Sequence, residues 1–138
     1  MSNIQEKQGG CMCGAVRFTA TDIEPAYHAC HCAMCRRWGS APFFGTTVGS
    51  IAFEDEANVG RHDSSEWAAR GFCKQCGSNL FYYMKPANYY SVSVGAFDDQ
   101  SDLQLSYEIY IDHKPEGYAI AGDLQAMTEA EVIEKFGG

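Results

Sequence analysis

Seven cysteines in three short clusters constrain this chain of 138 residues more than any other feature. The clusters are Cys11-Met12-Cys13, Cys30-His31-Cys32-Ala33-Met34-Cys35 and Cys73-Lys74-Gln75-Cys76. Closely spaced thiols are typical of a site for a soft divalent ion such as zinc. A closed structural zinc site uses four thiolates, whereas a catalytic zinc keeps three protein ligands and one free position. Seven cysteines therefore suggest two zinc sites, one closed and one open.

Charge and hydropathy narrow the range of partners and compartments. The 18 acidic side chains outnumber the 10 basic ones, which disfavours nucleic acid and anionic membranes as partners. The first ten residues have no apolar core, and no apolar run approaches the roughly 20 residues of a membrane span. We therefore expect a cytoplasmic protein without a signal peptide. In that compartment an odd number of clustered thiols favours metal binding over disulfides.

The apolar pattern predicts a mainly β protein with one domain. We expect a loose N-terminal arm over residues 1–8 and a single zinc-binding domain over residues 9–138. Residues 54–65 are polar and are expected to form a surface loop. Alternation and β-branched content predict strands at 15–20, 27–29, 43–48, 51–53, 67–72, 80–84, 89–94 and 103–111, with Gly49-Ser50 breaking the third from the fourth.

Two short segments are expected to be helical. Residues 33–38 can form about one helical turn, which would turn Cys32 and Cys35 toward the same side. In the tail, Thr128-Glu129-Ala130-Glu131 is a capping box and predicts a short C-terminal helix.

The spacing of the cysteines suggests which of them share a metal ion. The first and last clusters each present two thiols from a turn, and together they would join segments about 60 residues apart. That site would have a folding role, because the chain without metal would lose the link. The middle cluster would then hold the second ion. Spacing alone leaves other four-plus-three arrangements open.

Four motifs surround the cysteines and follow one another along the chain. They are G-x-C-x-C-G-x-V-x-F at residues 9–18, C-H-C-x-x-C-R-R-x-G-S at 30–40, F-C-x-x-C-G-S-x-L at 72–80 and V-x-x-G-x-x-D-D at 92–99. In this order they resemble the glutathione-dependent formaldehyde-activating enzyme family, also called the centromere-protein-V-like domain. The resemblance implies an Mss4-like (β-tent) fold and two zinc ions per chain.

The resemblance also implies a division of labour and a reaction. The implied structural zinc ligands are Cys11, Cys13, Cys73 and Cys76. The implied catalytic zinc ligands are Cys30, Cys32 and Cys35. The implied reaction joins formaldehyde to the thiol of glutathione and gives S-(hydroxymethyl)glutathione. The protein would then be a carbon–sulfur lyase or synthase whose partners are a small thiol and an aldehyde.

Elementary chemistry is consistent with a thiol substrate at the middle cluster. A free thiol has a pKa near 8.5 and is mostly protonated at neutral pH, whereas a zinc-bound thiol is deprotonated. Three cysteine thiolates leave the zinc complex with a net charge of about minus one, which makes the ion a poor Lewis acid. A bound sulfur would stay nucleophilic, so this ligand set favours thiol chemistry over water activation.

Three further residues beside the middle cluster are candidates for substrate contacts. His31 could move a proton or bind metal, and Arg36 and Arg37 could hold the carboxylates of glutathione as bidentate donors. The remaining histidines have no motif around them and are expected at the surface: His28, His62 and His113.

An alternative function stays open, namely a non-catalytic, zinc-stabilised binding module. In such a module the middle cluster would have a fourth protein ligand, for example His31, and would be closed. A thiol redox enzyme fits less well, because it needs a cysteine free of metal and every cysteine here belongs to a cluster. The oligomeric state is not predicted.

Overall fold

Strands dominate residues 2–136, the part of the chain that the computed structural model describes, which confirms the expected mainly β class. The strands are β1 (Ile4–Gly10), β2 (Arg17–Ile23), β3 (Ala26–Cys30), β4 (Phe43–Phe53), β5 (Val59–Asp63), β6 (Ala68–Cys73), β7 (Asn79–Met84), β8 (Tyr89–Ser93), β9 (Gln104–Ile109) and β10 (Gln125–Met127). The helices are α1 (Ala33–Gly39) and α2 (Glu129–Phe136). Neither helix is long and apolar enough to cross a membrane.

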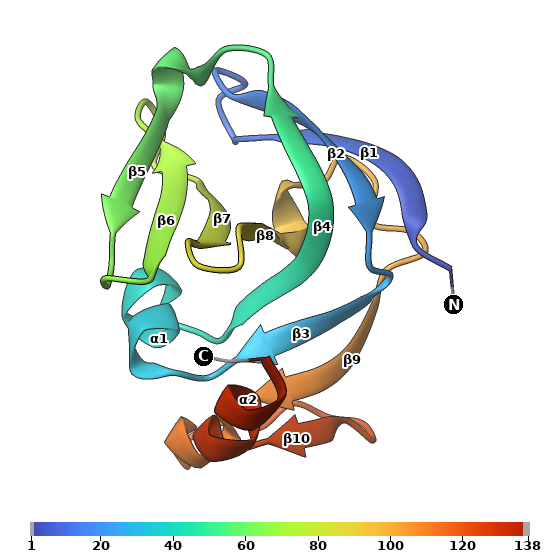
Figure 1. The fold of residues 1–138 in the computed structure, drawn as a ribbon, viewed down its shortest axis with the longest axis vertical. Helices are drawn as coiled ribbons and strands as arrows, with labels where there is room; N and C mark the ends of the chain where they lie inside the picture. The colour runs from blue at the N-terminus through green and yellow to red at the C-terminus, as the bar shows by residue number, and fades with distance from the viewer. Residues whose placement is uncertain (1, 137–138) are drawn as a thin grey trace.

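One mixed sheet contains these strands, and β4 is its central member. The strand order is β10-β9-β3-β4-β8-β7-β6-β5, and β2 joins the second half of β4 with β1 on its outer side. The first half of β4 pairs with β3 and β8, whereas its second half pairs with β2. Figure 1 shows β4 as a long curved strand around which the other strands are arranged. The curvature gives the sheet a concave face.

The expected break at Gly49-Ser50 is wrong, because β4 runs through it. Ser50 pairs with Thr21 of β2, so backbone pairing continues across the glycine. A Cβ atom at Gly49 would lie 2.8 Å from the Cβ of Asp22, so glycine here permits a close approach between strands.

The N-terminal segment is not a loose arm from Ile4 onward. It forms β1, which pairs antiparallel with β2 from Ile4 opposite Ile23 to Gly10 opposite Arg17. The ammonium group of Lys7 donates to the carbonyl oxygens of Asp99 and Ser101 at 2.7 and 3.0 Å. Backbone hydrogen bonds to β2 hold this polar segment as a strand. Such hydrogen bonds do not require alternating apolar side chains, so the sequence shows no strand pattern here.

The polar segment expected as a surface loop contains the edge strand β5. Only one side of β5 is paired, with β6, and its residues Arg61, His62 and Asp63 are exposed. Charged side chains are common on edge strands because they discourage pairing with other chains. The polar composition that suggested a loop therefore belongs to a sheet edge.

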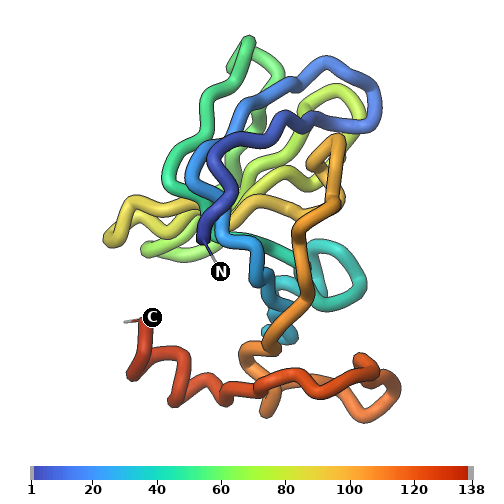
Figure 2. The backbone as a smooth tube through the Cα atoms, turned by 90° about the vertical axis from the view of Figure 1, so that its right-hand side faces the viewer, coloured from blue at the N-terminus to red at the C-terminus, as the bar shows by residue number. Residues whose placement is uncertain are grey.

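Two apolar clusters lie in different parts of the sheet. The larger packs side chains of β2, β4, β7 and β8, with Phe18, Leu80 and Phe81 at most 2% exposed. The smaller contains Cys30, Cys35 and Phe43 and lies beside α1. The chain after β9 forms a layer of its own at the bottom of Figure 2, in dark orange and red, and its strand β10 pairs with β9.

The capping box of the C-terminal helix is confirmed. The backbone N–H of Glu131 donates to Thr128 Oγ1 at 3.3 Å, and the N–H of Thr128 donates to Glu131 Oε1 at 2.9 Å. α2 is also attached to the preceding segment, since His113 Nε2 lies 2.9 Å from Glu129 Oε1. This attachment places α2 opposite the concave face of the sheet.

Candidate metal centres and active site

The first and last cysteine clusters come together in one four-cysteine centre. Its members are Cys11, Cys13, Cys73 and Cys76, whose sulfurs all lie within 4.8 Å of one another. The Cys13 and Cys73 sulfurs are 3.8 Å apart although the residues are 60 positions apart in sequence. The centre therefore links the turn before β2 to the turn between β6 and β7.

Local backbone geometry explains why these two turns present sulfurs. Gly14 and Gly77, which follow the two clusters, have φ angles of +82° and +80°, a region that favours glycine. The chain can therefore fold back and direct backbone N–H groups at the thiols. Val16 donates to Cys11 Sγ at 3.2 Å, and Gln75 donates to Cys73 Sγ at 3.3 Å. Such donors stabilise thiolates.

The middle cluster forms a separate three-cysteine centre. Its sulfurs, from Cys30, Cys32 and Cys35, also lie within 4.8 Å of one another, and no histidine or carboxylate of residues 2–136 joins them. Cys30 ends β3, and Cys32 is the N-cap of α1, where its sulfur accepts the N–H of Cys35 at 3.4 Å. A strand end and the first helical turn thus aim three sulfurs at one point.

Both donor sets fit a soft dication. All seven cysteines are free thiols. In the three-cysteine centre, hydrogen bonds from Cys30 and Cys35 lower the pKa of Cys32. The same contacts, with Cys32 first, raise the pKa of Cys30. One thiolate is thus stabilised at the expense of its neighbours, and a dication would replace the retained protons. Both centres could hold a metal ion.

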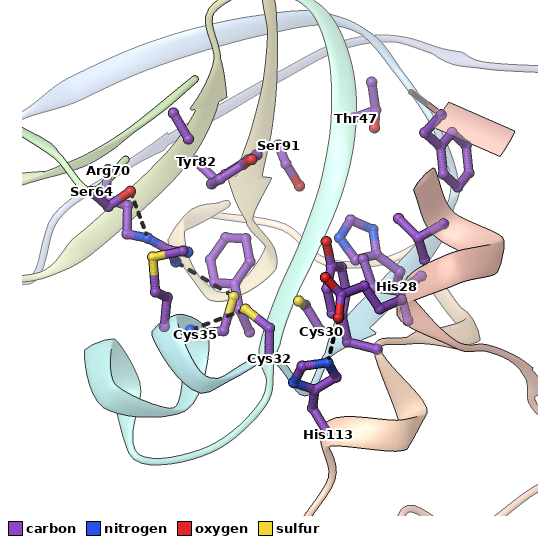
Figure 3. Close-up of a pocket in the computed structure, with 18 of the residues that line it drawn as sticks. His28, Cys30, Cys32, Cys35, Thr47, Ser64, Arg70, Tyr82, Ser91 and His113 are labelled. Carbon is purple, nitrogen blue, oxygen red and sulfur yellow. Dashed lines mark hydrogen bonds and ion pairs between the residues drawn. The ribbon is translucent and has the colours of Figure 1, made fainter. Parts of the chain in front are cut away.

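The three-cysteine centre lines a cavity of about 580 Å³ between the concave sheet face and α2. Figure 3 shows Cys30, Cys32 and Cys35 at one side of this cavity, with Ser91 and Thr47 at the opposite side. A volume of this size is typical of a small-molecule site. The four-cysteine centre contributes no residue to the lining. Only one of the two centres can therefore meet a ligand in this cavity.

Among residues 2–136, Arg70 is the one arginine or lysine that lines the cavity, and it was not predicted from the sequence. It is 5% exposed, its Nη1 donates to Cys35 Sγ at 3.4 Å and its Nε donates to Ser64 Oγ at 3.3 Å. Its guanidinium also lies over the rings of Trp38 and Tyr82, and Figure 3 shows Arg70 beside the cysteines. The sequence did contain a signal for this role. Arg70 stands in the otherwise apolar strand Ala68–Cys73, and a buried arginine needs a partner for its charge.

Two tyrosines pack against the three-cysteine centre and also line the cavity. Tyr82 and Tyr110 both contact its apolar cluster. Burial is the main cause that raises the pKa of each phenol, to about 12 for Tyr110. Both hydroxyls therefore stay protonated at neutral pH and can donate a hydrogen bond into the cavity.

The structure places His31 away from the cavity. Its side chain is fully buried, with Nε2 2.8 Å from Glu108 Oε1 and Nδ1 2.8 Å from the Tyr118 hydroxyl. Its backbone N–H donates to Ile109 O at 3.1 Å. These bonds attach the loop between two cysteines to β9 and to the C-terminal segment. Both ring nitrogens are engaged, so neither points at the sulfurs.

Arg36 and Arg37 are not among the described residues that line the cavity. The Nε of Arg36 donates to the carbonyl oxygen of His31 at 3.0 Å, and Arg37 is exposed on the outside of α1. By contrast, His28 and His113, expected at the surface, both line the cavity. Strand register brings His28 to the cavity face beside Gly45, and such register is not visible in the sequence.

Comparisons with known proteins agree with this architecture. Residues 6–113 match the family described as glutathione-dependent formaldehyde-activating enzyme. A Schizosaccharomyces pombe protein, whose curated name is uncharacterized lyase, is 36% identical over 134 residues that cover 95% of this chain and 97% of the relative. A crystal structure of a Rhodobacter sphaeroides protein has the same fold, with a TM-score of 0.55 and 21% identity over 88% of this chain and 99% of that one.

The family match includes every cysteine of both centres. It also covers the strands β2 to β9, which carry most of the cavity wall. The chain belongs to the glutathione-dependent formaldehyde-activating enzyme family.

Proposed function

We propose that this protein is a zinc-dependent carbon–sulfur lyase or synthase that acts on the adduct of a small thiol and an aldehyde. The simplest substrate pair is glutathione and formaldehyde, and the product is S-(hydroxymethyl)glutathione. The observation that carries the proposal is a three-cysteine centre with no fourth protein ligand among the described residues, on the wall of a cavity of about 580 Å³. The family description and the lyase name of the relative support the same reaction class.

Under this proposal each cysteine centre holds one zinc ion. Cys11, Cys13, Cys73 and Cys76 complete a four-thiolate set and serve the fold. Cys30, Cys32 and Cys35 leave one position for a ligand from the cavity. A zinc ion held there would supply a means to keep an incoming thiol ionised at neutral pH.

The reaction needs no further reactant. A carbon–sulfur bond forms between the thiol sulfur and the aldehyde carbon, the carbonyl π bond breaks, and the proton lost by the thiol ends on the new hydroxyl oxygen. Tyr82 and Tyr110 are protonated phenols beside the cysteines, and we assign them to hydrogen-bond the oxygen as its charge develops.

Arg70 serves the cysteines rather than the aldehyde in this proposal. Its Nη1 donates to Cys35 Sγ, and its Nε is engaged by Ser64. A guanidinium there offsets part of the negative charge of three thiolates and fixes the Cys35 side chain. We therefore describe Arg70 as a positioning residue.

A non-catalytic binding module is less well supported. Such a module needs a closed three-cysteine centre, and His31 was the candidate for the fourth ligand. Its ring nitrogens are engaged by Glu108 and Tyr118 instead. The three cysteines, which would hold the second ion, therefore have no fourth protein ligand among the described residues.

Exchange spectroscopy tests the proposed function directly. Magnetisation transfer between free formaldehyde and the hydroxymethyl group of the adduct measures the rate of bond making and breaking. We expect the zinc-loaded protein to raise this rate at least about tenfold over buffer. Cys32→Ser should return the rate to that of buffer, whereas Met34→Leu, on the same helical turn, should not. A zinc-loaded wild-type protein that leaves the buffer rate unchanged contradicts the proposal.

A further inference from the structure

The cavity extends beyond the cysteines along the sheet floor to a second group of polar residues. His28 lies two positions before Cys30 on β3 and pairs with Gly45 of β4. A Cβ atom at Gly45 would come within 2.5 Å of Ser91 Oγ and of the Phe43 ring. Because position 45 is a glycine, His28 and Ser91 can both lie over the same stretch of β4. We call Glu24, His28, Gly45 and Ser91 the Gly45 recess.

Two polar atoms of the Gly45 recess have no hydrogen-bond partner in the part of the chain that the structure describes. Ser91 is 2% exposed and its Oγ makes no hydrogen bond. The Nδ1 atom of His28 is also buried without a partner. Both residues line the cavity (Figure 3). A buried polar atom without a hydrogen-bond partner is unfavourable, so two such atoms on residues of one cavity wall point to a ligand that pairs with them.

The third polar member of the recess is acidic. Glu24 lines the same cavity, and its backbone N–H donates to Thr47 O at 3.0 Å. Thr47 is the residue of β4 that pairs with Ser91 of β8. No cation of residues 2–136 forms an ion pair with its carboxylate. Burial, with a smaller contribution from the charge of Asp22, raises the pKa of Glu24. A cationic ligand would compensate this burial.

The recess offers acceptors and no fixed positive charge. A carboxylate only accepts, and a serine hydroxyl and an imidazole nitrogen can each accept one hydrogen bond. Three acceptors on the wall of one cavity equal in number the three N–H donors of a primary ammonium group. The ring of Tyr107, whose centroid lies 5.4 Å from that of His28, adds an aromatic face near the recess.

We propose that the Gly45 recess binds a primary ammonium group of the thiol substrate. His28 and Cys30 are two steps apart along an extended strand, so the ammonium group lies roughly 7 Å from the sulfur that meets the cysteines. The proposal rests on the proposed function for the position of that sulfur. Glutathione carries one primary ammonium group, on its γ-glutamyl arm, and so belongs to the class that the recess admits.

A pair of isosteric thiols tests the inference by binding alone. Aminobutanethiol and pentanethiol differ only in an ammonium group in place of a terminal methyl group. We expect zinc-loaded wild-type protein to bind aminobutanethiol at least about tenfold more tightly in calorimetric titration. Glu24→Gln and Ser91→Ala should each remove most of this preference. Glu129→Gln, an equal charge change on the opposite cavity wall, should leave it within about twofold.

Each other outcome overturns the inference. Equal or tighter binding of pentanethiol, a preference that survives both recess variants, or binding of neither thiol would show that the recess does not select an ammonium group. Exchange spectroscopy with glutathione reports separately on the proposed function. An ammonium preference without turnover contradicts only that function, and turnover without the preference contradicts only the recess.

Discussion

The two cysteine centres use the same ligand chemistry in opposite surroundings. The four-cysteine centre joins turns 60 residues apart, includes the exposed Cys13, and lies outside the cavity. The three-cysteine centre comes from one segment of six residues, has two buried members, and borders the cavity. Long-range linkage suits a folding role, whereas a local ligand set with a free position suits a reactive one. Chain separation and cavity access thus distinguish the two centres where ligand type does not.

The groups that donate hydrogen bonds to the sulfurs also differ between the two centres. Around the four-cysteine centre the donors to sulfur are mostly backbone N–H groups, such as those of Val16 and Gln75. The three-cysteine centre has in addition a buried guanidinium, from Arg70. Backbone N–H donors are positioned by the turn that carries the cysteines. A buried arginine, by contrast, needs partners from other parts of the fold to compensate its charge. The cavity wall therefore contributes a charged partner to the three-cysteine centre.

Removing one ligand from each centre should give the largest contrast in stability. We expect Cys76→Ser to lower the melting temperature by about 10 °C or more, because it breaks the link between distant turns. Cys32→Ser should lower it by only a few degrees. Thermal unfolding followed by circular dichroism, with zinc in slight excess, makes the comparison. Equal losses would mean that both centres support the fold alike.

Activity should respond in the reverse order. We expect Cys32→Ser to abolish formaldehyde exchange, since the reactive centre would lose a ligand. A variant of the four-cysteine centre, such as Cys76→Ser, should retain measurable exchange if it remains folded at low temperature. The rate per folded molecule at about 10 °C is the quantity to compare. Loss of exchange in both folded variants would remove the distinction between the centres.

Arg70→Met should impair the activity of the three-cysteine centre and leave the four-cysteine centre unchanged. It keeps much of the side-chain volume and removes the donor to Cys35, so we expect a drop of about ten- to a hundredfold in exchange rate. Arg61→Met is the matched control, because Arg61 also stacks on aromatic rings, Phe81 and Tyr90, but lies outside the cavity lining. Similar rates for the two variants would show that the contact between Arg70 and Cys35 is not needed.

The smallest effect is expected for the two arginines of α1. Neither Arg36 nor Arg37 lines the cavity, so replacing each with alanine should change glutathione binding by less than about threefold. Calorimetric titration measures this. A loss of tenfold or more would favour the sequence-based assignment of these arginines to the substrate carboxylates.

The sequence predicted the mainly β class well, because strand alternation and turn residues are local signals. The capping box at Thr128 also predicted α2 correctly. The polar β1 escaped prediction, since its order comes from pairing with β2. The edge strand β5 was mistaken for a loop because its exposed charges resemble loop composition. Pairing partners decide both cases, and a single sequence does not display them.

The cysteines were predicted more readily than the rest of the candidate site. Thiols cluster visibly in sequence, and the structure brings together the two sets that the spacing suggested. The cavity wall depends on strand register, which places Arg70, Tyr82, Ser91 and Thr47 in one row across four strands. Proximity in sequence favoured Arg36 and Arg37, whereas the sheet brings Arg70 to the sulfurs from 35 residues away.

Cadmium-113 NMR of the substituted protein tests the central claim most directly, since cadmium replaces zinc at thiolate sites and its resonance reports the ligand set. We expect two resonances of equal intensity, one typical of four sulfur ligands and one of three sulfurs with a lighter ligand. Addition of a small thiol should move only the second resonance toward the four-sulfur position. A single resonance, or two that both ignore the thiol, would contradict the assignment of one closed and one open centre.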